Sequence, residues 1–155
     1  MSELTDALEQ IFSWLEENQP NRAEALEPGL TDNQIDEELK DLSIKLPTEV
    51  QELYKWHDGI SGSFLKDNDD IKFLSLWEAV DLYLNWNTNL FPLFFRHEVC
   101  FFIVVDGQEK ATSPIFSNDE LNLPDEPTYD SLTDMMALLA EQLEIEDLED
   151  IDIFN

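Results

Sequence analysis

Residues 46–59 read LPTEVQELYKWHDG, and they describe one short helix together with both of its ends. Pro47 suits a first helical position, because its ring fixes φ and its missing N–H would have no partner there. Val50, Leu53 and Tyr54 follow at helical spacing, and Gly59 can adopt the positive φ that closes a helix. The stretch predicts a helix over residues 48–57 with a structural role, because nothing in it needs a substrate.

The chain around this helix is strongly acidic. Its 155 residues include 36 Asp and Glu against 8 Lys and Arg, which gives a formal net charge of −28. Each phosphate contact needs a Lys or Arg, so the balance argues against nucleic acid as a ligand. It also disfavours an anionic membrane surface and favours a basic protein as partner. Because 43% of the residues are hydrophobic, the chain can bury a core as one domain.

The cysteine count and the lengths of the apolar runs indicate the cellular compartment of the protein. Cys100 is the single cysteine, so the sequence carries neither an internal disulfide nor a thiolate metal cluster. Residues 1–15 lack a basic segment and carry three acids, unlike a secretory signal peptide. No apolar run approaches the roughly 20 residues that a membrane-spanning helix needs. We therefore expect a cytoplasmic protein without cofactor.

Hydrophobic spacing and capping residues predict five helices. Thr31 with Gln34, and Ser75 with Glu78, have the spacing of capping boxes, and Ser131 can cap a last helix. The segment 18–29 contains Pro20, Pro28 and Gly29 and is interpreted as a connector. The predicted helices cover residues 4–17, 32–42, 48–57, 76–85 and 131–143.

Runs rich in aromatic and β-branched residues predict the strands, at residues 71–74, 90–95, 99–105 and 111–116. A tight connection at residues 96–98 joins the second and third runs, and Pro114 favours an edge position for the last. The unbroken apolar run 100–105 indicates a strand that is covered on both faces. The order predicts an α+β fold, with a mostly antiparallel central sheet packed with helices. We expect one domain over residues 1–143 and an acidic C-terminal tail over residues 144–155.

The few candidate catalytic groups favour structural roles. His57 falls at a helix C-terminus, where it can cap carbonyls and interact with the helix dipole. His97 lies in the predicted hairpin turn, which favours a surface position. Cys100 lies in an aromatic strand and is most simply a small core residue. The four tryptophans fall on predicted helices as core or rim residues: Trp14, Trp56, Trp77 and Trp86.

The loop over residues 61–70 contains Asp67, Asp69 and Asp70, which resemble the start of a calcium loop. Ile71 and Lys72 then occupy positions five and six, where such a loop needs an oxygen ligand and a glycine. A solvated acidic loop that contacts a basic partner is the better reading. For the acidic tail, residues 144–155, the sequence allows several roles. The tail could hold a basic partner or mimic a phosphate backbone, it could serve solubility, or its apolar residues could dock on the core.

The order of several motifs resembles the SUKH superfamily, which contains the fungal Smi/Knr cell-wall-assembly regulators and many bacterial toxin-immunity proteins. The motifs are Gly29-Leu30-Thr31, Ile35, Leu46-Pro47, Leu53-Tyr54, His57-Asp58-Gly59 and Phe73-Leu74-Ser75-Leu76. The resemblance covers about residues 29–143. Asp58 stands where the family usually has Asn, and residues 96–98 replace a turn rich in Gly and Asp. The resemblance implies an α+β domain with a central sheet, no catalytic apparatus and a protein-binding role, most often the neutralisation of a toxin.

Together these observations predict a non-enzymatic, acidic, protein-binding domain that acts as an immunity protein against a bacterial toxin. The alternative is a regulatory or scaffolding module of cellular machinery, and a third possibility is an enzyme that works with carboxylates alone. We expect no catalytic or metal-ligating residue. The predicted partner-binding residues lie in two polar loops, where binding surfaces are commonly presented: Asp67, Asp69, Asp70, Asp119, Glu120, Asp125 and Glu126.

Overall fold

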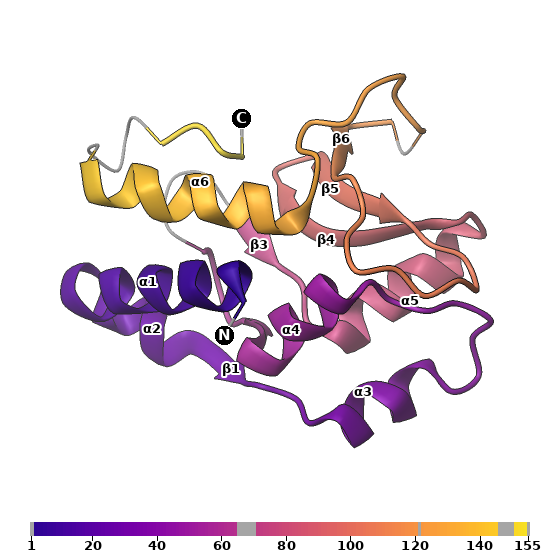
Figure 1. Cartoon of the computed structure of the whole chain (residues 1–155), viewed down its shortest axis with the longest axis horizontal. Coiled ribbons are helices and arrows are strands. Elements are labelled where there is room, and N and C mark those ends of the chain that lie inside the picture. The colour runs from indigo at the N-terminus through magenta and orange to yellow at the C-terminus, as the bar shows by residue number, and fades with distance from the viewer. Residues whose placement is uncertain (1, 65–70, 121, 146–150, 155) are drawn as a thin grey trace.

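The computed structural model describes residues 2–64, 71–120, 122–145 and 151–154. Six helices lie within this part of the chain (Figure 1). They are α1 (Glu3–Asn18), α2 (Pro20–Ala25), α3 (Asp32–Leu39), α4 (Thr48–Trp56), α5 (Leu76–Trp86) and α6 (Leu132–Ile145). Both predicted capping boxes are present, at the start of α3 and of α5. The five predicted helices are therefore confirmed with small shifts at their ends.

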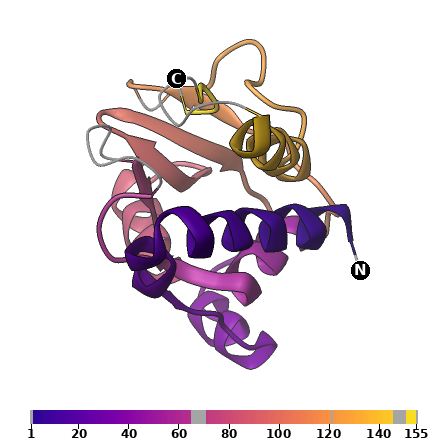
Figure 2. The same cartoon turned by 90° about the vertical axis from the view of Figure 1, so that its left-hand side faces the viewer.

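The strands form two antiparallel sheets, which together with the helices make an α+β fold, as predicted. The small sheet pairs β1 (Leu26–Pro28) with β2 (His57–Ile60). The large sheet has the order β3-β4-β5-β6. Its strands are β3 (Ile71–Phe73), β4 (Leu90–Arg96), β5 (Val99–Val104) and β6 (Phe116–Asn118). Helix α3 lies at the end of the molecule away from the large sheet (Figure 1, Figure 2).

The β4–β5 hairpin forms as predicted, with Arg96 opposite Val99 and His97 at φ +53° in the turn. Pro92 lies inside β4, next to a register shift between residues 92 and 94. A bulge is one of the few places where a sheet tolerates a residue without an N–H. Phe101 and Phe102 point to opposite faces of β5 and are both fully buried. The strand is thus covered on both faces, as its apolar run predicts.

The prediction of a strand at residues 111–116 is wrong over most of its length. Strand β6 begins at Phe116 and pairs only with β5, so it forms one edge of the large sheet. Residues 110 and 111 instead run along the start of α4, where their carbonyls accept hydrogen bonds from Thr48 and Glu49. The first N–H groups of a helix have no partner within the helix, and here two of them bond to these carbonyls. Residues 110 and 111 therefore do not extend the edge strand of the large sheet.

The two ends of α4 also differ from the prediction. Pro47 is the residue before the helix, and the helix ends at Trp56 because His57 is already extended, at φ −151°. Gly59 does have a positive φ, +80°, but it lies inside β2. Residues 18–29, predicted as a connector, contain α2 and β1. Strand β1 pairs with β2 directly after α4, a long-range contact that local sequence does not reveal.

The last described residues belong to the core. Ile151, Ile153 and Phe154 are buried, and the Phe154 ring lies 5.3 Å from the Phe94 ring and 5.5 Å from the Phe101 ring. These residues therefore dock on the core, one of the possibilities that the sequence leaves open. Residues 146–150 of the acidic tail lie outside the described residues, and the division of the chain at residue 143 stays a prediction. Among the described helices none is both long and apolar enough to cross a membrane.

Candidate partner-binding surface

The structure describes four of the seven predicted partner-binding residues. Asp119 and Glu120 follow β6, Asp125 and Glu126 precede α6, and all four are exposed. Asp67, Asp69 and Asp70 lie outside the described residues. The connection between β6 and α6 therefore carries two exposed acidic pairs.

Asparagine side chains shape the first of these acidic pairs. Asn118 Oδ1 accepts a hydrogen bond from the Glu120 backbone N–H at 3.2 Å, and the Asn122 amide donates to the Glu120 carboxylate at 3.2 Å. The Asn118 amide in turn donates to the Asn122 Oδ1, at 2.8 Å. Such local side-chain contacts hold a turn in one conformation. The segment thus presents its carboxylates from a hydrogen-bonded loop.

The contacts of His57 within the described residues are with a backbone carbonyl and with aromatic rings. The His57 Nδ1–H donates to the carbonyl of Glu27, the middle residue of β1, at 2.8 Å, so this ring nitrogen bonds to β1 rather than to the end of α4. Its ring stacks on Phe12 at 5.3 Å between centroids. His97 is exposed in the β4–β5 turn. Cys100 is fully buried, and its burial raises the pKa of the thiol to about 12, which keeps it protonated.

Among the described residues, almost all carboxylates are at least partly exposed. Within the described segments, Glu49 is the single buried acid, at 4% exposure. Its Oε2 accepts from the Ser113 N–H at 2.9 Å, and its Oε1 accepts from the Thr133 N–H and hydroxyl at 2.9 and 3.0 Å. Glu49 thereby joins α4 to the segment before β6 and to the start of α6. The sequence does not reveal the burial of Glu49, because nothing in an amphipathic helix marks one Glu as buried. In the described segments no cluster of three or more His, Cys, Asp or Glu could hold a metal ion.

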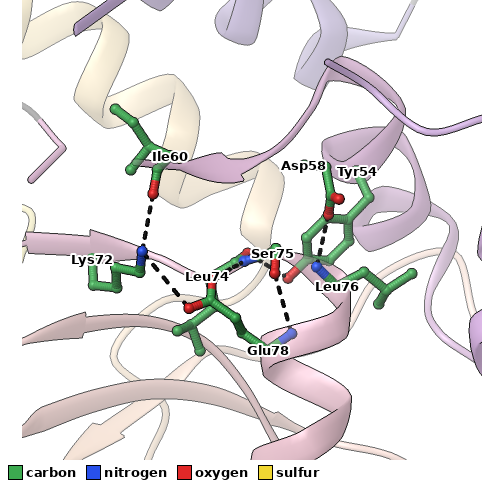
Figure 3. A network of polar contacts seen from close by, with 8 residues as sticks. All are labelled: Tyr54, Asp58, Ile60, Lys72, Leu74, Ser75, Leu76 and Glu78. Carbon is green, nitrogen blue, oxygen red and sulfur yellow. Dashed lines mark hydrogen bonds and ion pairs between the residues drawn. The ribbon is translucent and has the colours of Figure 1, made fainter. Parts of the chain in front are cut away.

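A polar network fixes the N-terminus of α5 against β2 and β3 (Figure 3). Ser75 and Glu78 form the capping box, with Ser75 Oγ accepting from the Glu78 N–H at 3.1 Å. Lys72 Nζ donates to the Ile60 carbonyl at 2.9 Å and pairs with the Glu78 carboxylate at 3.8 Å. The Tyr54 hydroxyl donates to the Leu74 carbonyl at 3.1 Å. These bonds lock the start of α5 in place and contain no activated nucleophile.

Asp58, the second acid of this network, is half-buried. Its Oδ1 accepts from the Leu76 N–H at 2.8 Å, so the side chain adds a second cap to α5 (Figure 3). Burial raises its pKa above the ordinary value of 3.8, and the charges of Glu27 and Glu78 raise it further, against the opposing effect of the Leu76 hydrogen bond. Burial, with the charges of Asp58 and Glu78, also raises the pKa of Tyr54, which therefore remains a hydrogen-bond donor.

A groove lies next to Asp58, between α3 and α5. It encloses about 300 Å³ and is lined by Leu30, Asn33, Gln34, Glu37, Glu38, Asp58, Leu76 and Trp77. The lining combines an apolar floor with acidic side chains. Trp77 is 64% exposed, whereas Trp14, Trp56 and Trp86 are partly buried against the core. The groove was not predicted from the sequence. One signal for it was present, because Trp77 lies off the apolar stripe that Leu76, Val80 and Tyr83 form along α5.

A larger hollow, of about 660 Å³, lies on the other side of α3 and is less acidic. Lys40, Lys45 and Lys110 line it together with Asp36 and Glu109. Each lysine is paired with an acid: Lys40 with Glu37, Lys45 with Glu109 and Lys110 with Asp106. Three of the chain's eight basic residues therefore gather on one side, which leaves the β6–α6 connection and the α3–α5 groove as acidic surfaces.

No protein-family model matches the sequence, and no curated protein matches it significantly. The resemblance to the SUKH superfamily therefore stays a prediction.

Proposed function

We propose that the protein is a non-enzymatic binding domain that captures a basic protein and, as an immunity protein, neutralises a toxin. The observation that carries the proposal is the outward placement of the charge. The chain has a net charge of −28, and Glu49 is the one acid buried within the described segments. A surface of one sign speeds the encounter with a partner of the opposite sign and selects against partners of the same sign.

The β6–α6 connection supports the proposal in a second way. A toxin that acts on nucleic acid has a basic active-site cleft, made for phosphates. Asp119, Glu120, Asp125 and Glu126 are exposed on a connection that can enter such a cleft without copying a base. The motifs shared with the SUKH superfamily and the α+β fold agree with this role.

Co-expression tests the immunity function. Each gene next to the coding gene is expressed in a test bacterium alone and together with this protein. The expected result is a gene whose product stops growth, and growth that returns when this protein is present. A variant with Asp119→Asn, Glu120→Gln, Asp125→Asn and Glu126→Gln should protect less well at equal abundance.

A pull-down from the native cell, eluted by rising salt, can contradict the proposed function in two ways. Recovery of a component of cellular machinery, with no toxic neighbour, would replace the immunity role by the regulatory one. An acidic partner that stays bound at high salt would remove the electrostatic mechanism itself.

A further inference from the structure

We propose that the groove between α3 and α5 is an anchor pocket for an arginine side chain of the basic partner, with the guanidinium stacked on Trp77 and its N–H groups on the surrounding carboxylates. The inference rests on the proposed function, because it names how that partner is held. It starts from an exposed tryptophan: Trp77 is 64% exposed although Leu76 before it is fully buried.

The apolar part of the lining favours an occupant with an apolar stem. Leu30, which is half-buried, and the exposed Trp77 provide carbon surface along the lining. Arginine covers such surface with its methylene chain while its charged head stays at the rim. Helix α5 starts from two caps, Ser75 and Asp58, so the indole at its second residue is presented from a fixed backbone.

The negative charge of the groove favours a ligand with a cationic head group. Glu37, Glu38 and Asp58 line it, and no Lys or Arg belongs to its lining. Glu37 already pairs with Lys40, which lies outside this lining, at 3.0 Å. Asp58 uses Oδ1 for the Leu76 N–H, and no described residue donates to its Oδ2, which can therefore accept from a ligand. An anion would be repelled here, and an apolar side chain would strip water from the acids without replacing it.

Arginine fits better than lysine. Its guanidinium is planar, stacks on an aromatic face and carries five donors in a fixed fork. The groove offers one indole and the carboxylates of Glu38 and Asp58, beside Glu37, which pairs with Lys40. A lysine ammonium has three donors and no plane to lay on Trp77, so it would use fewer of these groups.

NMR titration of the whole protein tests the pocket. The probe is Nα-acetyl-L-arginine amide, and the readouts are the indole N–H signal of Trp77 and the backbone N–H of Leu76. Both should shift in a saturable manner. The matched neutral probe, Nα-acetyl-L-citrulline amide, should shift them several times less at equal concentration, and Nα-acetyl-L-lysine amide should bind more weakly than the arginine probe.

Substitutions in the groove test whether the arginine probe binds there. Trp77→Leu keeps an apolar side chain and should weaken binding roughly two- to five-fold, the range expected for one exposed cation–π contact. Glu37→Gln with Glu38→Gln should also weaken it. The control is Leu84→Ala, which removes a side chain that is 56% exposed on the same helix and outside the groove lining, and should leave the affinity unchanged.

Two outcomes would overturn the pocket: equal shifts with citrulline and arginine, or unchanged binding in Trp77→Leu. If the arginine probe does not bind the wild-type protein while the wild type still protects growth, the pocket fails and the proposed function stands. If the probe binds as expected but no toxic partner is found, the pocket stands and the proposed function fails.

Discussion

At the scale of single residues, the His57-Asp58-Gly59 segment is defined by its contact with the start of α5. Gly59 has a φ of +80°, and a Cβ on it would lie 2.6 Å from the Ser75 nitrogen. Asp58 reaches the same place with its side chain and accepts from the Leu76 N–H. The sequence predicts the positive φ of Gly59 but assigns it to a helix end, because the neighbouring backbone of Ser75 comes from a distant part of the chain.

Gly59→Ala should therefore destabilise the protein more than a glycine substitution at an open position. Gly62 is the matched control, because it also has a positive φ, +98°, but a Cβ on it would meet nothing within 4 Å. Gly62→Ala should cost about 1–2 kcal/mol of unfolding free energy, the penalty for a left-handed residue. Gly59→Ala should cost about 1–3 kcal/mol more, because it also forces two backbones apart. Urea unfolding measures both, and equal losses would contradict the close approach.

Asp58→Asn should raise the free energy of unfolding at pH 7. Asparagine keeps the Oδ1 acceptor for Leu76 and removes a charge that burial and the charges of Glu27 and Glu78 disfavour. Because the folded-state pKa of Asp58 is raised, its ionisation costs the folded state stability as the pH rises above 3.8. The advantage of Asp58→Asn should therefore vanish below pH 3.8 and be complete above the raised pKa.

Asp58→Ala serves as the comparison for this series. It removes the same charge but also the acceptor for Leu76, and the loss of a helix cap costs about 1 kcal/mol. Thermal unfolding between pH 3 and pH 8 compares the three proteins. A constant difference between Asp58→Asn and the wild type across this range would contradict the assigned pKa shift.

At the scale of elements, the sequence predicts what local periodicity and caps determine. The helices capped by Thr31 and Ser75 and the β4–β5 hairpin appear where these signals place them. The errors occur where a distant segment decides the structure. Strand β1 needs β2 as its partner, and residues 110 and 111 are held by the start of α4. The α3–α5 groove belongs to the same class, because its walls come from separate helices.

The C-terminal segment provides a test at this scale. Phe154 is 3% exposed and touches the rings of Phe64, Phe94 and Phe101. Phe154→Ala should lower the free energy of unfolding by about 3–5 kcal/mol, as for other buried phenylalanines. The control is Ile145→Ala, at the end of α6, where the side chain is 70% exposed and its loss should cost less than about 0.5 kcal/mol. Similar losses in chemical denaturation would show that the segment does not belong to the core.

At the scale of the whole molecule, charge is the dominant property. A net charge of −28 acts on any partner before contact, whereas the loops and the groove act only once the surfaces meet. The two contributions can be separated, because screening by salt removes the first and leaves short-range contacts largely intact.

The association rate with the identified partner should fall as salt rises, most steeply below the concentration, about 1 M, at which the Debye length is ~3 Å. Neutralising Asp119, Glu120, Asp125 and Glu126 should lower the rate at low salt. The matched control neutralises four exposed acids of α1, Asp6, Glu9, Glu16 and Glu17, so both variants move the net charge from −28 to −24. A larger effect of the loop variant places the contact on the β6–α6 connection. Equal effects would mean that net charge alone steers the encounter, and a salt-independent rate would favour a hydrophobic interface.

The packing of α6 over α1 has a consequence for how the chain folds as it is made (Figure 1). At 5–20 residues per second, a ribosome needs on the order of ten seconds to synthesise the segment between these two helices. Until then α2 and α4 contact α1, but the part of its buried side that packs against α6, on the face that carries Leu4, Leu8 and Ile11, has not met this partner. One side of α1 therefore waits for α6 until late in synthesis, and we expect a chaperone to bind the emerging chain there.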